Sequence, residues 1–138
     1  MPARRMSKAD FEAMAGFRYR LRQFLRFSEE ATRRSGVTPL QYQLMLQIKG
    51  FPGRDWASVA ELAERLQAKH HGIVALITRC ESIGLVQRSA SRTDQRRVEI
   101  SLTKEGERCL ERLARLHREE LRSVQHGFAV PGLAVDPD

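Results

Sequence analysis

The chain carries four arginines within ten residues, at Arg88, Arg92, Arg96 and Arg97. They flank or lie in the polar segment SASRTDQR, which separates two strand-like runs and predicts the tip of a β-hairpin. Guanidinium groups donate charge-assisted hydrogen bonds to phosphate, so we expect this hairpin to contact a nucleic-acid backbone. Asp94 is expected to hold Arg96 through an ion pair and so to shape the tip. The alternative is an ordinary solvated turn.

A second polar set precedes the hairpin, at the start of a helix predicted over residues 70–83. Ile73, Ile77 and Cys80 mark its apolar face. The residues expected to meet a DNA groove are Lys69, His70, His71, Gly72 and Ala75. The histidines either contact DNA or are ordinary surface residues, and Gly72 either permits close approach or merely weakens the helix. Lys69 stands where a capping oxygen is usual, which costs the helix about 1 kcal/mol.

These two sets need elements that bring them together. Ser58 and Glu61 predict a capping box at the start of a short helix, and residues 67–69 predict the tight turn after it. The run 98–102 alternates apolar and polar residues, as a half-buried strand does. Helix, turn, helix and hairpin in this order predict a winged helix-turn-helix over residues 38–102. In such a unit the second helix enters the major groove, beside the hairpin.

Long helices are predicted on both sides of this unit. Residues 7–35 contain no proline, and apolar or small residues recur there at steps of three and four: Met14, Phe17, Leu21, Phe24, Ser28 and Ala31. Residues 103–126 carry a similar seam, and the tail 127–138, with two glycines and two prolines, is expected to be irregular. The prediction is one domain over residues 1–138, mainly α with a small β-hairpin wing.

Composition narrows the function classes. A net charge of +7 and a pI near 10.2 suit nucleic acid or an acidic membrane face. No apolar run approaches the roughly 18 residues of a membrane span, and the start has no secretory pattern, so we expect a cytoplasmic protein with no membrane partner. Nucleophile elbows and glycine-rich phosphate loops are missing from the sequence. Adjacent His70 and His71 make a poor metal pair. We therefore expect no enzyme, no cofactor and no metal.

Three further residues have two readings each. Cys80, on the apolar face of its helix, is expected to be a small core residue. Cys109 lies near Arg108 and Arg112, whose charges would lower its pKa, and a thiol switch is the lesser alternative there. His117 lies on the seam of the last helix, where a hydrogen-bonded interface histidine is favoured over a ligand for metal or effector.

Two segments, SVAELAERL over 58–66 and IVALITRCESIGLVQRSASRTDQRRVEISLTKEGE over 73–107, resemble the MarR (multiple antibiotic resistance regulator) family of bacterial regulators. The likeness rests on Asp94 and Arg96, the alternating strand after them, and Leu102-Thr103 before a helix start that bears Gly106. It covers about residues 10–125. The resemblance implies a winged-helix fold whose two long helices form the dimerisation region. It also implies a homodimeric, sequence-specific regulator, a repressor in our reading, on a pseudo-palindromic operator. Arg79 matches a family position that stays near the DNA backbone.

The resemblance further implies release of DNA by an oxidant or by an effector bound between the terminal helices and the winged unit. Such crevices accept aromatic acids and phenols, and the candidate walls here are Phe17, Phe24, Tyr42 and Trp56. Plain core packing is the alternative for each ring. The chain departs from the family in its tail, which is short for a further dimerisation helix. A separate hypothesis is a winged-helix module that offers its basic face to an acidic protein or RNA.

Overall fold

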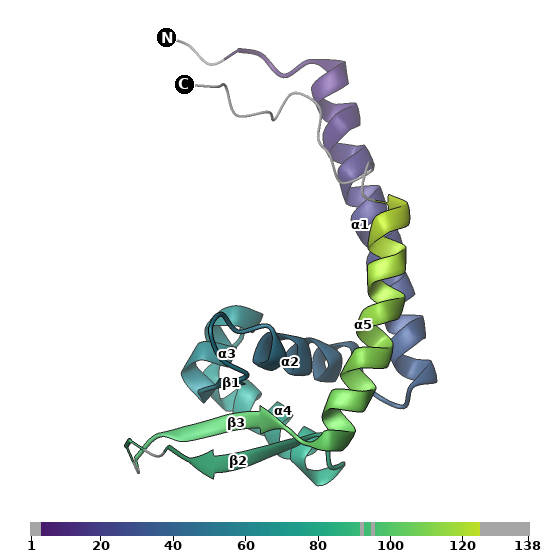
Figure 1. Ribbon diagram of the computed structural model, residues 1–138. Coiled ribbons are helices and arrows are strands. Elements are labelled where there is room, and N and C mark those ends of the chain that lie inside the picture. Colours follow the sequence, from purple (N-terminus) through teal and green to yellow (C-terminus); the bar gives the residue numbers. More distant parts are fainter. Residues whose placement is uncertain (1–3, 92, 95, 125–138) are drawn as a thin grey trace.

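The computed structural model describes residues 4–91, 93–94 and 96–124 of the chain. These residues form α1 (Lys8–Arg34), α2 (Pro39–Lys49), β1 (Trp56–Ala57), α3 (Val59–Leu66), α4 (His70–Ser82), β2 (Val86–Ala90), β3 (Val98–Leu102) and α5 (Lys104–Val124), as Figure 1 shows. The predicted fold class, mainly helical with a small hairpin wing, is confirmed. The predicted tail at 127–138, and the last two residues of the helix predicted over 103–126, lie outside the described residues.

Side-chain hydrogen bonds fix where four of the helices begin. Each N-cap hydroxyl of α1, α2 and α3 accepts the N3 amide, and the N3 side chain accepts the N-cap amide, in the pairs Ser7–Asp10, Thr38–Gln41 and Ser58–Glu61. At α5 the Thr103 hydroxyl accepts the Gly106 N–H at 3.0 Å and donates to the Gly84 carbonyl at 2.6 Å. Thr103 therefore caps α5 and ties its start to the end of α4.

A two-residue strand that the sequence pattern does not predict completes the sheet. β1 adds to the hairpin in the antiparallel order β1-β3-β2. Trp56 pairs with Ser101 and Ala57 with Ile100, while β2 and β3 pair over their full lengths. Two residues are too few to show the alternation by which strands are recognised. Its effect is to tie the base of the wing to the segment between α2 and α3.

The core lies between α2, α3, α4, the sheet and the first turns of α5. Its largest fully buried side chains include Leu44, Met45, Ile48, Leu62, Ile73, Ile77, Ile100 and Leu113. Burying one side chain of this kind is worth about 1.5–3 kcal/mol. Because the helices of the helix-turn-helix and the strand β3 all contribute, α4 and the wing are packed into one unit.

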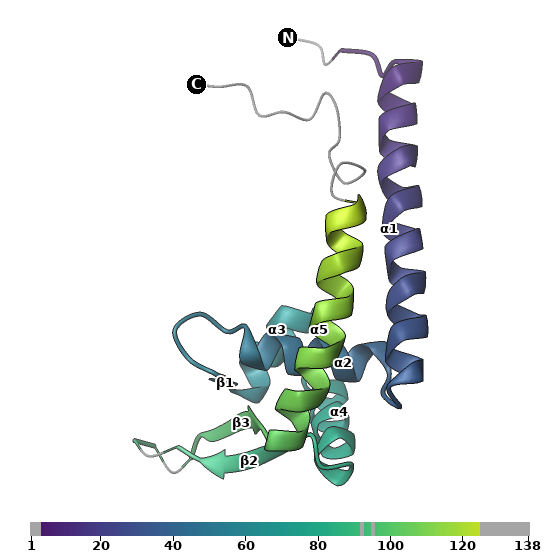
Figure 2. The same ribbon diagram turned by 45° about the vertical axis from the view of Figure 1, so that its right-hand side comes forward.

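Helices α1 and α5 leave this unit together. Figures 1 and 2 both show them side by side, projecting away from the sheet, and the first turns of α1 reach past the described end of α5. The buried residues of α1, Ser28, Ala31 and Thr32, lie near its end. Near its start, Phe11 and Met14 are 56% and 53% exposed. The described part of one chain therefore leaves apolar surface of α1 uncovered.

A buried histidine joins α1, α2 and α5. The His117 ring stacks on Tyr42, with 4.2 Å between centroids and 14° between planes, and two phenylalanine rings of α1 meet it edge-on. Its Nδ1 lies 2.7 Å from the Leu113 carbonyl, which can only accept, so Nδ1 carries the proton. In the neutral ring Nε2 then accepts from the Ser28 hydroxyl at 2.9 Å. As predicted, this histidine is hydrogen-bonded, and both partners belong to its own chain.

Candidate nucleic-acid interface

Helix α4 presents a polar face to solvent. Its buried side chains are Ile73, Leu76, Ile77 and Cys80. All six residues at or near this helix that were predicted to meet DNA are exposed, namely Lys69, His70, His71, Gly72, Ala75 and Arg79. Helical spacing places Thr78 on the same face, three residues after Ala75 and seven after His71. The sequence interpretation missed Thr78, although the periodicity that it used elsewhere would have found it.

The N-terminus of α4 has no side-chain cap. Lys69 occupies the N-cap position with an extended backbone, at φ −75° and ψ 149°, and its side chain makes no capping hydrogen bond. This confirms the expectation from the residue type. The first backbone N–H groups of a helix and the positive end of its dipole both favour a negative charge. Here the residues at the helix start, 69–72, are all exposed, and one of them is the cation Lys69.

Arg88 braces the wing against α4. Its guanidinium donates to Glu81 Oε1 at 2.6 Å and to the Thr78 hydroxyl at 3.0 Å. The hairpin and α4 therefore lie side by side, at the end of the molecule away from the first turns of α1, as both ribbon views show (Figures 1 and 2). Arg88 was predicted to contact DNA, but in this structure its guanidinium is bonded to Glu81 and Thr78.

Asp94 shapes the wing tip through the backbone. Its Oδ1 accepts the Arg96 N–H at 3.0 Å, and its carbonyl accepts the Arg97 N–H at 3.0 Å. The predicted ion pair between the Asp94 and Arg96 side chains is not formed, and the Asp94 carboxylate holds the backbone N–H of Arg96 instead. The Arg96 side chain is left exposed, with no carboxylate partner among the described residues. Arg92, also predicted as a contact, lies outside the described residues.

Arg97 turns toward the body of the winged unit. Its Nη2 lies 3.9 Å from Glu61 Oε1, and its guanidinium carbon 5.6 Å from the centroid of the Trp56 ring. Arg54 stands over the same ring at 3.9 Å and forms a close ion pair with Glu61. Burial alone would raise the pKa of Glu61, but hydrogen bonds from Ser58 and the charge of Arg54 outweigh it and hold that pKa below its ordinary value. We call Arg54, Trp56, Glu61 and Arg97 the wing-base cluster.

The four rings predicted to wall an effector crevice lie in different surroundings. Tyr42 is buried against His117, and Phe24 meets the same histidine from α1. Trp56 lies on the edge strand β1, where Arg54 and Arg97 stand over its ring, so its described ring contacts differ from those of Tyr42 and Phe24. Phe17 is half-buried on α1. Plain packing, the alternative reading, describes Tyr42 best.

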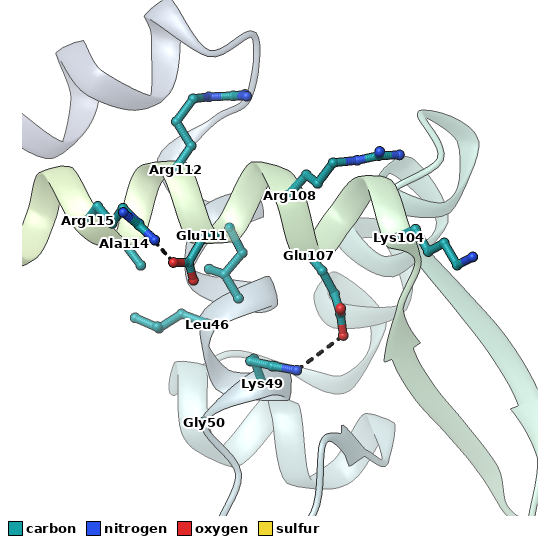
Figure 3. Close-up of a pocket in the computed structure, with 11 residues that line it drawn as sticks. Leu46, Lys49, Gly50, Lys104, Glu107, Arg108, Glu111, Arg112, Ala114 and Arg115 are labelled. Atoms are coloured by element: carbon teal, nitrogen blue, oxygen red, sulfur yellow. Dashed lines mark hydrogen bonds and ion pairs between the residues drawn. The ribbon is translucent and has the colours of Figure 1, made fainter.

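An open groove of about 860 Å³ lies instead between α2 and α5 (Figure 3), and none of the four rings lines it. Leu46, Leu110 and Ala114 supply its apolar surface. Two ion pairs stand along it, Lys49–Glu107 at 3.1 Å and Arg115–Glu111 at 2.8 Å. The groove therefore combines apolar wall with cations, which suits an organic molecule that carries a negative group.

Both cysteines are buried and unreactive in character. Burial raises the pKa of Cys80 to about 11, in keeping with its expected place in the core. Burial also raises the pKa of Cys109, by more than the charge of Arg112 lowers it. The expectation of a lowered pKa there is wrong, because the sulfur is inside while the exposed guanidinium of Arg112 is screened by water. Figure 3 shows Arg108 and Arg112 on the side of α5 away from α2.

Across the described ranges, no group of three or more histidine, cysteine or acidic residues is placed to hold a metal ion. No helix in that part of the chain combines the length and the apolar character needed to cross a membrane.

Sequence comparison connects this interface with regulators of transcription. Residues 35–97 match the model of the MarR family. The chain is 31% identical over 78 residues to the HTH-type transcriptional repressor MdtR of Bacillus subtilis, a match that covers 56% of this chain and 48% of MdtR. The chain thus aligns with about half the length of this curated relative.

Comparison of structures extends the likeness to the long helices. AbsC, a MarR family transcriptional regulator from Streptomyces coelicolor, superposes with a TM-score of 0.75 at 21% identity, over 94% of this chain and 86% of AbsC. A MarR mutant of E. coli complexed with operator DNA gives 0.63 at 21% identity, over 77% of each chain. BpsR of Bordetella bronchiseptica, whose DNA binding is regulated by 6-hydroxynicotinic acid, gives 0.62 at 16% identity, over 77% of this chain and 74% of BpsR. These likenesses show a shared winged-helix fold.

Proposed function

Because residues 35–97 match the model of the MarR family, we propose that this chain is a transcriptional regulator of that family, which binds double-stranded operator DNA as a homodimer and represses the adjacent genes. The observation that carries the proposal is the bracing of the wing on α4 by Arg88. A groove-sized helix and a cationic hairpin are thereby held at one end of the molecule, which is the arrangement that a duplex requires.

In this proposal α4 enters the major groove by its N-terminal end. The exposed residues from Lys69 to Ala75 face base edges and phosphates, and Arg79 stays near the backbone. A phosphate oxygen accepts the uncapped N–H groups at the start of α4. Arg92 and Arg96 reach the phosphates or minor groove beside the wing. Arg88 and Asp94 act on DNA binding indirectly, because Arg88 fixes the position of the hairpin and Asp94 fixes the shape of its tip.

The second copy supplies the second half of the interface. Exposed Phe11 and Met14 on α1 support pairing through the long helices. Two copies related by a two-fold axis present two α4 helices about one turn of DNA apart, roughly 34 Å, so the operator is pseudo-palindromic. The E. coli MarR mutant that shares the fold was solved with operator DNA.

The proposal is tested by fluorescence anisotropy with three probes: DNA from beside the chain's own gene, a random duplex, and single-stranded RNA. We expect the first to bind most tightly and the RNA most weakly. Ala75→Glu keeps a good helix former but puts a carboxylate at the groove, so it should weaken duplex binding at least tenfold. Gln23→Glu adds the same charge on α1 and should change little. Preference for RNA, or an unaffected Ala75→Glu variant, would point to a different partner.

We further propose that a small aromatic acid or phenol releases the DNA by binding between α2 and α5. The groove there joins a long helix to the winged unit, so a ligand that fits one relative position of the two better than another shifts the DNA-binding equilibrium. Lys104, in the lining, is the group that would pair with a carboxylate, since Lys49 is already held by Glu107. Regulation of BpsR by 6-hydroxynicotinic acid supports this ligand class.

Release is tested by titrating aromatic acids and phenols, 6-hydroxynicotinic acid among them, into the protein–DNA complex. Ala114→Phe places a ring in the groove, far from α4, and should bind DNA as the wild type does while failing to respond to a ligand that releases the wild type. Equal release from both proteins would place the effector elsewhere.

A further inference from the structure

The wing-base cluster holds its two arginines unequally. Oε2 of Glu61 is in the close ion pair with Arg54, while Oε1 accepts the Ser58 N–H at 3.0 Å and has Arg97 only at 3.9 Å. The side chains of Arg54 and Glu61 are 22% and 25% exposed, whereas that of Arg97 is 50% exposed. Arg54 therefore satisfies the carboxylate by itself, and Arg97 is held loosely.

The loose hold on Arg97 matters because of where Arg97 lies in the wing. Arg97 stands between the wing tip, where its N–H closes the Asp94 turn, and strand β3, which begins at the next residue. Its guanidinium carbon lies 5.6 Å from the centroid of the Trp56 ring, while that of Arg54 is nearer, at 3.9 Å. A half-exposed guanidinium beyond hydrogen-bond distance of its carboxylate is free to exchange it for a better acceptor.

Building on the proposed DNA binding, we propose that Glu61 is a positioning residue that holds Arg97 at the wing base and yields it to a DNA phosphate when the wing docks. Phosphate offers Arg97 the short, bidentate hydrogen bonds that Glu61 does not. The exchange leaves no orphaned carboxylate, because Arg54 and the Ser58 amide remain on Glu61. In the free protein Glu61 thereby withholds part of the charge of Arg97 and weakens attraction to any duplex.

Two variants on α3 separate this role from a structural one. Glu61→Gln removes the charge but keeps the volume and the side-chain acceptor that the capping box needs. Glu64→Gln removes an equal charge one turn away, from an exposed side chain whose described hydrogen-bond partner is Gln67. Trp56, the single tryptophan of the chain, reports locally on Arg97 through its fluorescence.

The experiment measures binding of a random duplex by the full chain across a salt series. We expect Glu61→Gln to bind about two- to fivefold more tightly than Glu64→Gln, and the gain to vanish when Arg97→Ala is added to both. Arg97→Ala alone should lower the slope of log K against log salt by about 0.9 for each subunit. DNA should change Trp56 fluorescence in the wild type and less in Arg97→Ala.

Equal affinities of the two glutamine variants, or an unchanged slope in Arg97→Ala, would overturn the exchange while leaving DNA binding intact. Weaker binding by Glu61→Gln would overturn it as well, since a purely structural role predicts that result. Failure of the wild type to bind any duplex is a separate outcome, because it removes the proposed function itself and the exchange with it.

Discussion

At the scale of single residues, the partner of a side chain decides its task more than its type does. Arg88 is engaged by Glu81 and Thr78, Arg97 is held loosely by Glu61, and Arg96 is exposed. All three lie on one hairpin. Positive charge attracts such a hairpin to DNA. However, a guanidinium that is already paired with a protein carboxylate interacts less strongly with a phosphate than an unpaired one does.

His117 provides a residue-scale test of the link between the long helices and the winged unit. His117→Ala removes the ring stacked on Tyr42 and both of its hydrogen bonds, and should lower the free energy of unfolding by about 3 kcal/mol. His117→Phe keeps a stacked ring and should cost less than half of that. Urea denaturation of both variants measures the difference. Equal stability of His117→Ala and the wild type would contradict the account of this junction.

The thiols give a second test at this scale. Burial raises the pKa of Cys80 to about 11 and also raises that of Cys109, so both are protonated thiols at neutral pH. Because the thiolate is the nucleophile, a disulfide reagent such as DTNB should label the folded protein slowly at pH 7 and faster as the pH rises. Urea-unfolded protein should label at once. Rapid labelling of Cys109 in folded protein at pH 7 would revive the thiol switch.

At the scale of elements, the start of α5 is fitted closely onto the chain between α4 and β2. A Cβ built at Gly106 would lie 2.0 Å from the Leu85 carbonyl oxygen, so only glycine permits this approach. The Thr103 hydroxyl bonds the Gly84 carbonyl beside it. This contact couples the long helix α5 to the elements that carry the interface.

Two glycine-to-alanine changes test that coupling. Gly106→Ala should destabilise the protein by about 2 kcal/mol, because backbone atoms must move apart. Gly72→Ala, on α4 where nothing lies within 4 Å of the added atom, should be neutral or should stabilise by up to about 1 kcal/mol through helix propensity. Thermal unfolding of the two variants provides the measurement. A neutral Gly106→Ala would refute the close approach.

The elements were largely predictable from the sequence, whereas the partners within the site were not. Caps at Ser7 and Ser58, the uncapped Lys69 and the period change at the hairpin are local signals, and local signals survive folding. Glu61 and Glu81 hold wing arginines across element boundaries, so sequence spacing could not pair them. The two-residue strand β1 was not predicted for the same reason, since only its pairing with β3 defines it as a strand.

At the scale of the whole molecule, one described chain leaves an apolar stripe uncovered beside the seam that packs on α5. Phe11, Met14 and Leu25 share this side of α1 by helical spacing, and each is about half exposed. Exposed apolar stripes of this kind mark association surfaces. The proposed homodimer would cover it.

Analytical ultracentrifugation measures whether the protein pairs in solution. The wild type, 15.8 kDa per chain, should sediment as a dimer at micromolar concentration. Met14→Glu puts a charge in the stripe and should shift the protein toward monomer, while Gln23→Glu puts the same charge on the opposite side of α1 and should remain dimeric. A monomeric wild type would contradict pairing through α1.

The central claim, that α4 and the wing together bind duplex DNA, is tested most directly by the salt dependence of binding in Arg96→Ala. Arg118→Ala, which removes an exposed arginine of α5, is the matched control. If Arg96 contacts phosphate, its loss should weaken binding to operator and random duplex alike and lower the slope of log K against log salt by about 0.9 for each subunit. Affinity and slope equal to those of Arg118→Ala and the wild type would contradict the claim.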